Sequence, residues 1–269
     1  MFQEVIVSEL SRRILTAVIG IPLLILFIEL GGIFFTLLVL LFVILSLQEF
    51  FNLVHKKGFE SYRTPALFLG ALLVLTGHFG GLYILNLALL SSFFLLFFIY
   101  ELRAKISGSI ISLSFTFFGI FYLAFLLSHA VLLREYERDG KFFLYLSIAV
   151  TMLNDTGAYF IGRYLGRHKL APSISPSKTI EGFLGGFLFG IPSGLLINYF
   201  FRDYRHWTIF TLSFLICISA VIGDLAESLL KRDAGVKDSG SFFPGHGGVL
   251  DRIDSLLFTI PVTYYFLRF

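Results

Sequence analysis

Long apolar runs separated by short polar segments dominate this chain of 269 residues. A helix that crosses a membrane needs roughly 20 mainly apolar residues, because each residue rises about 1.5 Å across a hydrocarbon layer about 30 Å thick. The pattern therefore predicts an all-α polytopic integral membrane protein with about nine transmembrane helices. Their ranges are 14–30, 33–48, 65–80, 82–100, 109–133, 142–162, 180–200, 208–230 and 253–267. Glycine pairs at 31–32 and 80–81 predict tight turns inside two helical hairpins.

The lysines and arginines predict the orientation of these helices. If the N-terminus is cytoplasmic, fifteen of the 21 basic residues fall on cytoplasmic segments and six on outer segments. Basic loops favour the cytoplasmic side of a membrane. We therefore expect a multi-pass protein of the cell inner (cytoplasmic) membrane, with its N-terminus cytoplasmic and its C-terminus outside. The polar segments of the second half, and any active site they form, then face the cytoplasm.

Composition supports a membrane protein and argues against other classes. Hydrophobic residues make up 57% of the chain and charged residues 14%, whereas a soluble domain carries about 25% charged residues. The net charge is only +3, and the basic residues lie in short loops between apolar runs, so they do not indicate nucleic-acid binding. The one cysteine, Cys217, excludes an intrachain disulfide. We expect a single membrane-embedded domain over residues 1–269, with mainly scaffold helices in 1–140 and catalytic helices and cytoplasmic loops in 141–269.

Ionisable residues enter the apolar ranges mainly in the second half. On a helix, Asp155, Tyr159 and Arg163 share one face. An acid inside a span is costly unless it serves a cavity or a partner, and Asp155 could also pair with Arg163 for purely structural reasons. Lys178 lies near the start of the next predicted span, and a helix N-terminus beside a lysine suits a phosphate group.

A second group of polar residues lies on one helix face near the C-terminal end of the predicted span 208–230. Asp224, Ser228 and Lys231 follow one another at i, i+4 and i+7, so they lie on one side of an apolar helix. Glu227 and Lys231 could form an i, i+4 ion pair. That pair could equally be a solvated contact at the membrane edge.

Residues 237–255 form the densest polar stretch. Four glycines in this segment, at 240, 245, 247 and 248, can expose backbone N–H groups to phosphate oxygens. Asp251 and Asp254 follow directly, and carboxylates beside a phosphate-binding loop suit Mg²⁺. His246 fits a phosphate contact or a proton shuttle, and a structural loop histidine equally well. This chemistry predicts a membrane enzyme that acts on a phosphate-rich substrate with a divalent metal.

Two motifs in these stretches resemble a known family. The first is Ser228-x-x-Lys231-Arg232-x-x-x-x-Lys237-Asp238-x-x-x-x-x-Pro244-Gly245-His246-Gly247-Gly248-x-x-Asp251-Arg252-x-Asp254. It resembles the pattern of phosphatidate cytidylyltransferases, also called CDP-diacylglycerol synthases. Asp155-x-Gly157-Ala158-Tyr159 and Ser175-Pro176-x-Lys178-Thr179-x-Glu181-Gly182 resemble the same family. Ser177 stands where a basic residue is common, and the N-terminal half shares only its hydrophobicity.

The resemblance implies the reaction CTP + phosphatidate → CDP-diacylglycerol + pyrophosphate in phospholipid biosynthesis. It also implies dependence on Mg²⁺, a monovalent cation such as K⁺ beside it, and a homodimer in the lipid bilayer. By position, Asp224 and Asp251 match the metal carboxylates. The implied catalytic residues are Asp224, Asp251, Lys237, His246 and Arg252. The implied substrate-binding residues are Asp155, Lys178, Ser228, Lys231, Arg232, Gly247 and Gly248.

Two alternatives stay open at this stage. Acids inside a membrane often mark ion pathways, so a transporter or ion-coupled channel is one of them. Against it, the ionisable residues gather at one end of the helices and no inverted repeat is visible. Another CTP-dependent lipid enzyme, such as a polyprenol kinase, is the second alternative. A CDP-alcohol phosphotransferase fits less well, because its spaced four-aspartate motif is absent.

Overall fold

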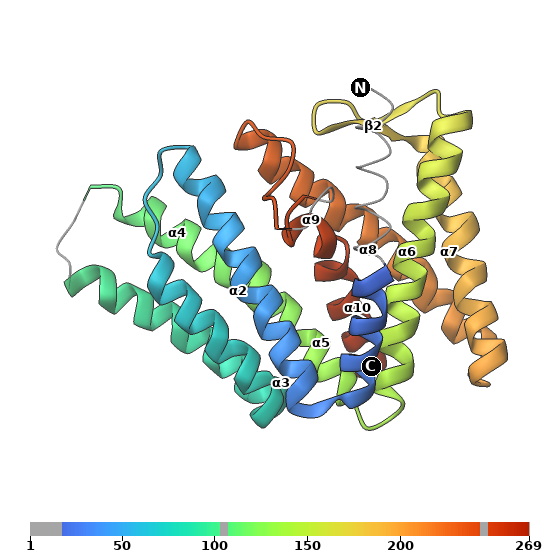
Figure 1. Ribbon diagram of the computed structural model, residues 1–269, viewed down its shortest axis with the longest axis horizontal. Helices are drawn as coiled ribbons and strands as arrows, with labels where there is room; N and C mark the ends of the chain where they lie inside the picture. The colour runs from blue at the N-terminus through green and yellow to red at the C-terminus, as the bar shows by residue number, and fades with distance from the viewer. Residues whose placement is uncertain (1–17, 103–106, 243–246, 269) are drawn as a thin grey trace. The chain divides into compact units, whose positions relative to one another are not determined.

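The computed structural model describes residues 18–102, 107–242 and 247–268, and nearly all of its regular structure is helical (Figure 1). After a helix at Val18–Leu30 come four helices and a π-helical turn: α2 (Gly32–Lys56), α3 (Arg63–Leu102), α4 (Ser109–Gly119), η1 (Ile120–Phe125) and α5 (Leu126–Arg134). The second half holds α6 (Gly140–Leu165), α7 (Ile180–Phe201), α8 (His206–Asp233), α9 (Leu250–Ile253) and α10 (Leu256–Arg268). Two short strands, β1 (Lys169–Ala171) and β2 (Ser175–Thr179), stand between α6 and α7.

Several helices have the length and composition of membrane spans. Five meet both criteria in the described residues: α2, α3, the continuous helix Ser109–Arg134, α7 and α8. Inside α3, Gly81 has φ +64° and interrupts the helical backbone, so α3 consists of two helices that match the predicted ranges 65–80 and 82–100. The first predicted range, 14–30, begins outside the described residues. The protein is thus a multi-pass, predominantly helical membrane protein, as the apolar pattern predicted.

The helices pack into two compact units. The first holds α2 to α5 together with residues 234–252, and the second holds α6 to α8, the strand pair and α10. Each unit has its own buried apolar core. In the first, Leu47 of α2 packs so closely on α3 that a Cβ added at Gly70 would lie 2.7 Å from its Cδ1.

Two charged side chains form hydrogen bonds with the backbone on either side of the first tight turn of that unit. Arg134 donates from Nε to the carbonyl of Ile28 at 2.6 Å, and Glu135 Oε1 accepts from the backbone N–H of Gly32 at 2.9 Å. These contacts satisfy a carbonyl at the end of one helix and an N–H at the start of the next, which lack partners within the helices themselves. The turn at Gly31 and Gly32 is confirmed, and both residues have positive φ.

Glycines bring α6 and α7 into close contact in the second unit. Gly182, Gly186, Gly190 and Gly194 repeat every four residues and are all buried, so they form a stripe of small residues along α7. A Cβ added at Gly157 of α6 would lie 2.6 Å from the carbonyl oxygen of Gly185. Such stripes let the backbones of membrane helices approach. The absence of a side chain at Gly157 therefore lets the backbone of α7 approach α6 closely.

The strand pair before α7 was not predicted. β1 and β2 pair antiparallel, with Lys169 opposite Thr179 (Figure 1). Glu181, in the first turn of α7, accepts from the backbone N–H of Arg167 at 3.0 Å and from His168 Nδ1 at 2.6 Å. Thr179 Oγ1 accepts from Gly182 N at 3.0 Å and caps the helix. Lys178 therefore lies in β2, one residue before the capping residue of α7.

Asp139 ties the start of α6 to the end of α7, and we expect its substitution to lower stability in a pH-dependent way. Arg202 donates from Nε and Nη2 to the two carboxylate oxygens at 3.0 Å, and the Tyr204 hydroxyl donates at 2.8 Å. These hydrogen bonds, with that of Arg202 the strongest, hold the pKa of Asp139 below its usual value. A carboxyl group with a lowered folded pKa stabilises the fold above its unfolded pKa, and this contribution disappears as pH falls through the folded pKa.

Asp139→Asn should therefore lower the Tm by about 1–3 °C at neutral pH, the range for a partly exposed ion pair. The difference from the parent should shrink in acid, well below the usual Asp pKa of about 4. Differential scanning fluorimetry in detergent at both pH values measures this. Glu137→Gln, which changes an exposed acid two residues away, serves as the control. An Asp139→Asn deficit that persists unchanged in acid would contradict the assigned cause.

Candidate functional site

Acidic and basic side chains of α6, β2, α8 and the turn before α10 gather around α8 in the second unit. Lys178 Nζ of β2 lies 2.5 Å from Asp224 Oδ2 of α8, and the two side chains are 22% and 33% exposed. Ser228 Oγ, one turn along α8, donates to Asp224 Oδ1 at 3.3 Å. Asp155 of α6 and Asp254, just before α10, both repel Asp224 electrostatically. We call Asp155, Lys178, Asp224, Ser228 and Asp254 the α8 cluster.

The surroundings of Asp155 and Glu227 distinguish this cluster from the structural alternatives. Arg163 donates to the Tyr159 hydroxyl, whereas Asp155 interacts with Asp224 and Lys178, so Asp155 serves the cluster rather than a brace along its own helix. The predicted i, i+4 pair of Glu227 and Lys231 is present. Glu227 is fully buried, so the pair is not a solvated contact. A buried acid beside Lys231 fixes where its ammonium group lies.

The charge of this region suits a cation. Asp155, Asp224, Glu227 and Asp254 bring four acids, and Lys178 and Lys231 bring two lysines, an excess of two negative charges when all are ionised. Within the described ranges no three His, Cys, Asp or Glu side chains are grouped as a metal cage. Mg²⁺ does not need one, because it binds through one or two carboxylates, substrate phosphates and waters. The oxygen donors present therefore fit Mg²⁺.

The first unit carries the other candidate residues, on a segment that we call the glycine loop, residues 237–251 without 243–246. Asp251 Oδ2 accepts three hydrogen bonds within this loop: from Gly248 N at 2.7 Å, Ser239 Oγ at 2.9 Å and Ser239 N at 3.0 Å. A Cβ at Gly247 would lie 2.6 Å from the same oxygen, and Gly247 has φ +80°. Asp251 thus organises the two glycines predicted to contact phosphate.

The remaining predicted residues fall into three groups. Lys237 and Arg252 are exposed at the two ends of the glycine loop, where phosphate can reach them. Arg232 is exposed at the end of α8 and donates from Nε to the carbonyl of Ile174 at 3.3 Å, in the turn between the strands. His246 lies outside the described residues.

Glu49 is a site residue that the sequence analysis missed. The predicted span ended at residue 48, which would put Glu49 at the membrane edge, but α2 continues to Lys56. Glu49 is buried, 8% exposed, and binds the glycine loop. One signal was available: Glu49 is the only acid in an apolar helix of 25 residues.

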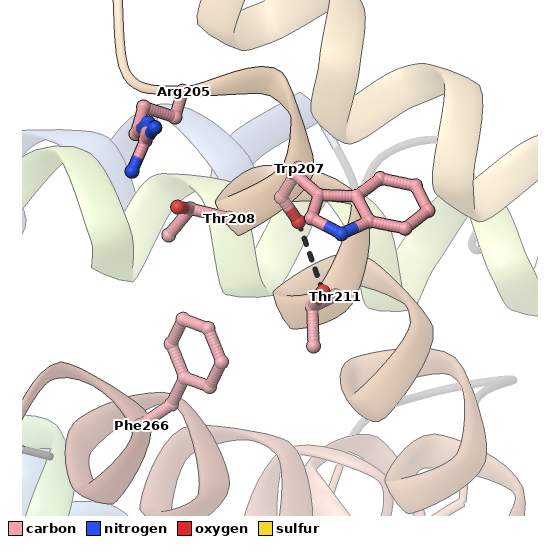
Figure 2. A pocket seen from close by; sticks show the side chains of 5 residues that line it. All are labelled: Arg205, Trp207, Thr208, Thr211 and Phe266. Carbon is pink, nitrogen blue, oxygen red and sulfur yellow. Dashed lines mark hydrogen bonds between the residues drawn. The ribbon is translucent and has the colours of Figure 1, made fainter.

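A pocket at the other end of α8 is separate from the cluster (Figure 2). It has a volume of about 360 Å³ and is lined by Arg205, Trp207, Thr208, Thr211 and Phe266. Trp207 and Asp224 are 17 positions apart on α8, roughly 25 Å along a helix. That is close to the thickness of the hydrocarbon layer. The pocket therefore carries none of the predicted site chemistry.

Comparison with known proteins decides between an enzyme and a transporter or channel. The profile of the cytidylyltransferase family matches residues 11–269. This chain belongs to the cytidylyltransferase family. A phosphatidate cytidylyltransferase of Synechocystis sp. is 35% identical over 96% of this chain and 96% of its own. One from Staphylococcus haemolyticus is 34% identical, with 93% and 96% covered. The uncharacterized protein YnbB of Escherichia coli is 40% identical over 61% of this chain and 56% of its own.

Family membership confirms the resemblance drawn from the two motifs and extends it to the N-terminal half. This cytidylyltransferase is thus a nucleotidyltransferase rather than a transporter or channel. The match from residue 11 onward includes α2, so the helix that carries Glu49 belongs to the shared architecture.

Proposed function

We propose that this cytidylyltransferase is a phosphatidate cytidylyltransferase that makes CDP-diacylglycerol and pyrophosphate from CTP and phosphatidate in phospholipid biosynthesis. The observation that carries the proposal is the α8 cluster, in which three carboxylates and Lys178 gather at the apolar helix α8 of a chain that matches this family over residues 11–269. The two full-length relatives that carry this name support the choice of substrates. A lipid substrate keeps its acyl chains in the bilayer, so only its phosphate has to reach the cluster.

The chemistry asks little of the protein beyond position and charge. An oxygen of the phosphatidate phosphate attacks the α-phosphorus of CTP, the new P–O bond forms, and the bond to the β-phosphate breaks to release pyrophosphate. The nucleophile is already an anion, so no strong general base is required. Positioned cations stabilise the charge that spreads over the phosphates. We assign this role to Lys178 and Lys231 in the second unit, to Lys237 in the glycine loop and to Arg252 directly after it.

Mg²⁺ completes this proposal. We assign Asp224 and Asp251 as its protein ligands, supported by the excess negative charge around Asp224 and by the position of Asp251 next to Gly247 and Gly248. A bound Mg²⁺ neutralises triphosphate charge and favours pyrophosphate as the leaving group. K⁺ as a second cation stays a prediction of the resemblance.

The membrane arrangement is part of the same proposal. We propose nine spans, an N-terminus in the cytoplasm, a C-terminus outside and an active site that faces the cytoplasm across the inner membrane. The bias of basic residues supports this orientation. The helix break at Gly81 supports counting α3 as two spans. A homodimer and a single membrane-embedded domain remain predictions as well.

The test is pyrophosphate release by the purified full chain in detergent. Release should require CTP, phosphatidate and Mg²⁺ together, should stop with a chelator and should resume when Mg²⁺ is restored. The lipid product should be CDP-diacylglycerol by mass spectrometry. Turnover of CTP with an isoprenoid alcohol but not with phosphatidate would replace this proposal with the polyprenol kinase alternative. Undiminished release in the chelator would refute the metal assignment.

A further inference from the structure

Glu49 of α2 holds the glycine loop at two points distant in the sequence. One carboxyl oxygen, Oε1, accepts from the backbone N–H of Val249 at 2.9 Å. The other, Oε2, accepts from the N–H of Leu250 at 2.9 Å and from the hydroxyl of Ser239 at 3.0 Å. Glu49 lies 190 residues or more from each of these partners in the sequence. A buried side chain of the N-terminal half thus supports the start and the end of the loop.

The Ser239 hydroxyl links Glu49 to Asp251. Its oxygen lies 3.0 Å from Glu49 Oε2 and 2.9 Å from Asp251 Oδ2. A hydroxyl has one proton, so Ser239 can donate to only one of these two carboxylate oxygens at a time, and the two oxygens share the donor. A displacement of Glu49 therefore changes how this proton is shared with Asp251, the carboxylate that we assign to the metal.

The two glycines nearest Glu49 show how little free space surrounds this contact. A Cβ at Gly248 would lie 2.3 Å from Glu49 Oε2, and one at Gly240 would lie 2.5 Å from Oε1. Real Cβ atoms essentially never make contacts below 3.0 Å. A side chain at 240 or 248 would therefore displace the Glu49 carboxyl group from its present position. The loop is built around this carboxyl group.

We propose that Glu49 is a positioning residue for CTP: it fixes the glycine loop so that its backbone N–H groups and Asp251 meet the triphosphate. The inference rests on the proposed function. Glu49 reaches the loop backbone and Ser239 and acts through them. It follows that α2 is part of the catalytic apparatus.

Kinetics of Glu49→Gln, with the full chain in detergent, test the role. The amide keeps the shape but offers an NH₂ group where the carboxyl oxygen accepted, so at least one loop N–H loses its acceptor. Because a displacement of about 1 Å can cost 10²-fold in rate, kcat/KM for CTP should fall by about that factor. The KM for CTP should rise, and the KM for phosphatidate should stay within about twofold, since the loop meets the nucleotide.

Controls separate positioning from loss of folded protein. Glu101→Gln alters an exposed acid of α3 in the same unit and should leave both KM values unchanged. A purely structural role for Glu49 predicts a lower kcat with an unchanged KM for CTP, and that result would overturn the proposal. Ser239→Ala keeps both backbone hydrogen bonds of Glu49 and should raise the KM for CTP by a smaller factor. If Glu49→Gln does not fold, an unchanged KM for CTP in Ser239→Ala overturns the proposal instead.

Hydrogen exchange tests the anchoring without any turnover. Amide exchange at residue 249 or 250 should rise at least about tenfold in Glu49→Gln, because the N–H that faces the new NH₂ group loses a buried acceptor. Unchanged exchange would refute the anchoring itself. Absence of CTP turnover in the parent chain would refute the proposed function and, with it, the assignment to CTP. Normal turnover in both parent and Glu49→Gln would refute this inference alone.

Discussion

Asp224→Asn should reduce CDP-diacylglycerol synthesis on the order of 10²–10³-fold, the usual effect of removing one preorganised charge from a site. Asp224 is the centre of the α8 cluster: it contacts Lys178 and Ser228 and repels Asp155 and Asp254. Asparagine keeps the size and one acceptor oxygen but loses the charge that we assign to Mg²⁺. The measurement is initial-rate pyrophosphate release against Mg²⁺ concentration, and the remaining activity should need more Mg²⁺.

A double variant that removes the charges of both Asp224 and Lys178 distinguishes a metal ligand from a simple counter-ion. If Asp224 only neutralised Lys178, the Mg²⁺ concentration for half-maximal rate would recover to the parental value when both charges are removed in Asp224→Asn with Lys178→Met, whatever rate remains. We expect the double variant to need as much Mg²⁺ as Asp224→Asn alone. Asp203→Asn alters an exposed acid of the same unit and should keep parental activity. Recovery in the double variant would remove Asp224 from the metal site.

The helices could be predicted from the sequence because their cause is local. Apolar runs of the right length specify helices in lipid, and the breaks at Gly31 and Gly81 coincide with glycines of positive φ. The pair of Glu227 and Lys231 follows from helical spacing alone. Helical spacing also placed Asp224 and Ser228 on one helix face, which their hydrogen bond confirms.

The contacts that assemble the site could not be predicted in the same way. The pair of Lys178 and Asp224 joins β2 to α8 across 46 positions, and periodicity says nothing about which helices become neighbours. The strand pair depends on Glu181, which binds the backbone at Arg167 and His168, and an acid at the first turn of a helix normally indicates only a favourable dipole interaction. Glu49 is missed for the same reason, because its partners lie at the other end of the chain.

Asp251→Asn should lower activity by on the order of 10²–10³-fold while the glycine loop keeps its fold. Only one carboxylate oxygen, Oδ2, accepts the bonds from Gly248 and Ser239. The amide oxygen of asparagine can take over that position, so the loop geometry survives while the charge is lost. Activity in detergent should therefore fall far more than the Tm, which we expect to change by only a few degrees.

An exposed acid of the same unit gives the control for Asp251. Glu101→Gln removes an exposed carboxylate of α3 and should leave activity within about twofold of the parent, since surface changes have small effects. Near-normal turnover in Asp251→Asn would exclude Asp251 from the metal site and leave it the role of binding Ser239 and Gly248. A collapse of the Tm together with activity would instead show that the carboxylate mainly builds the loop. The proposed role requires lost activity in a folded protein, with the Mg²⁺ requirement raised as in Asp224→Asn.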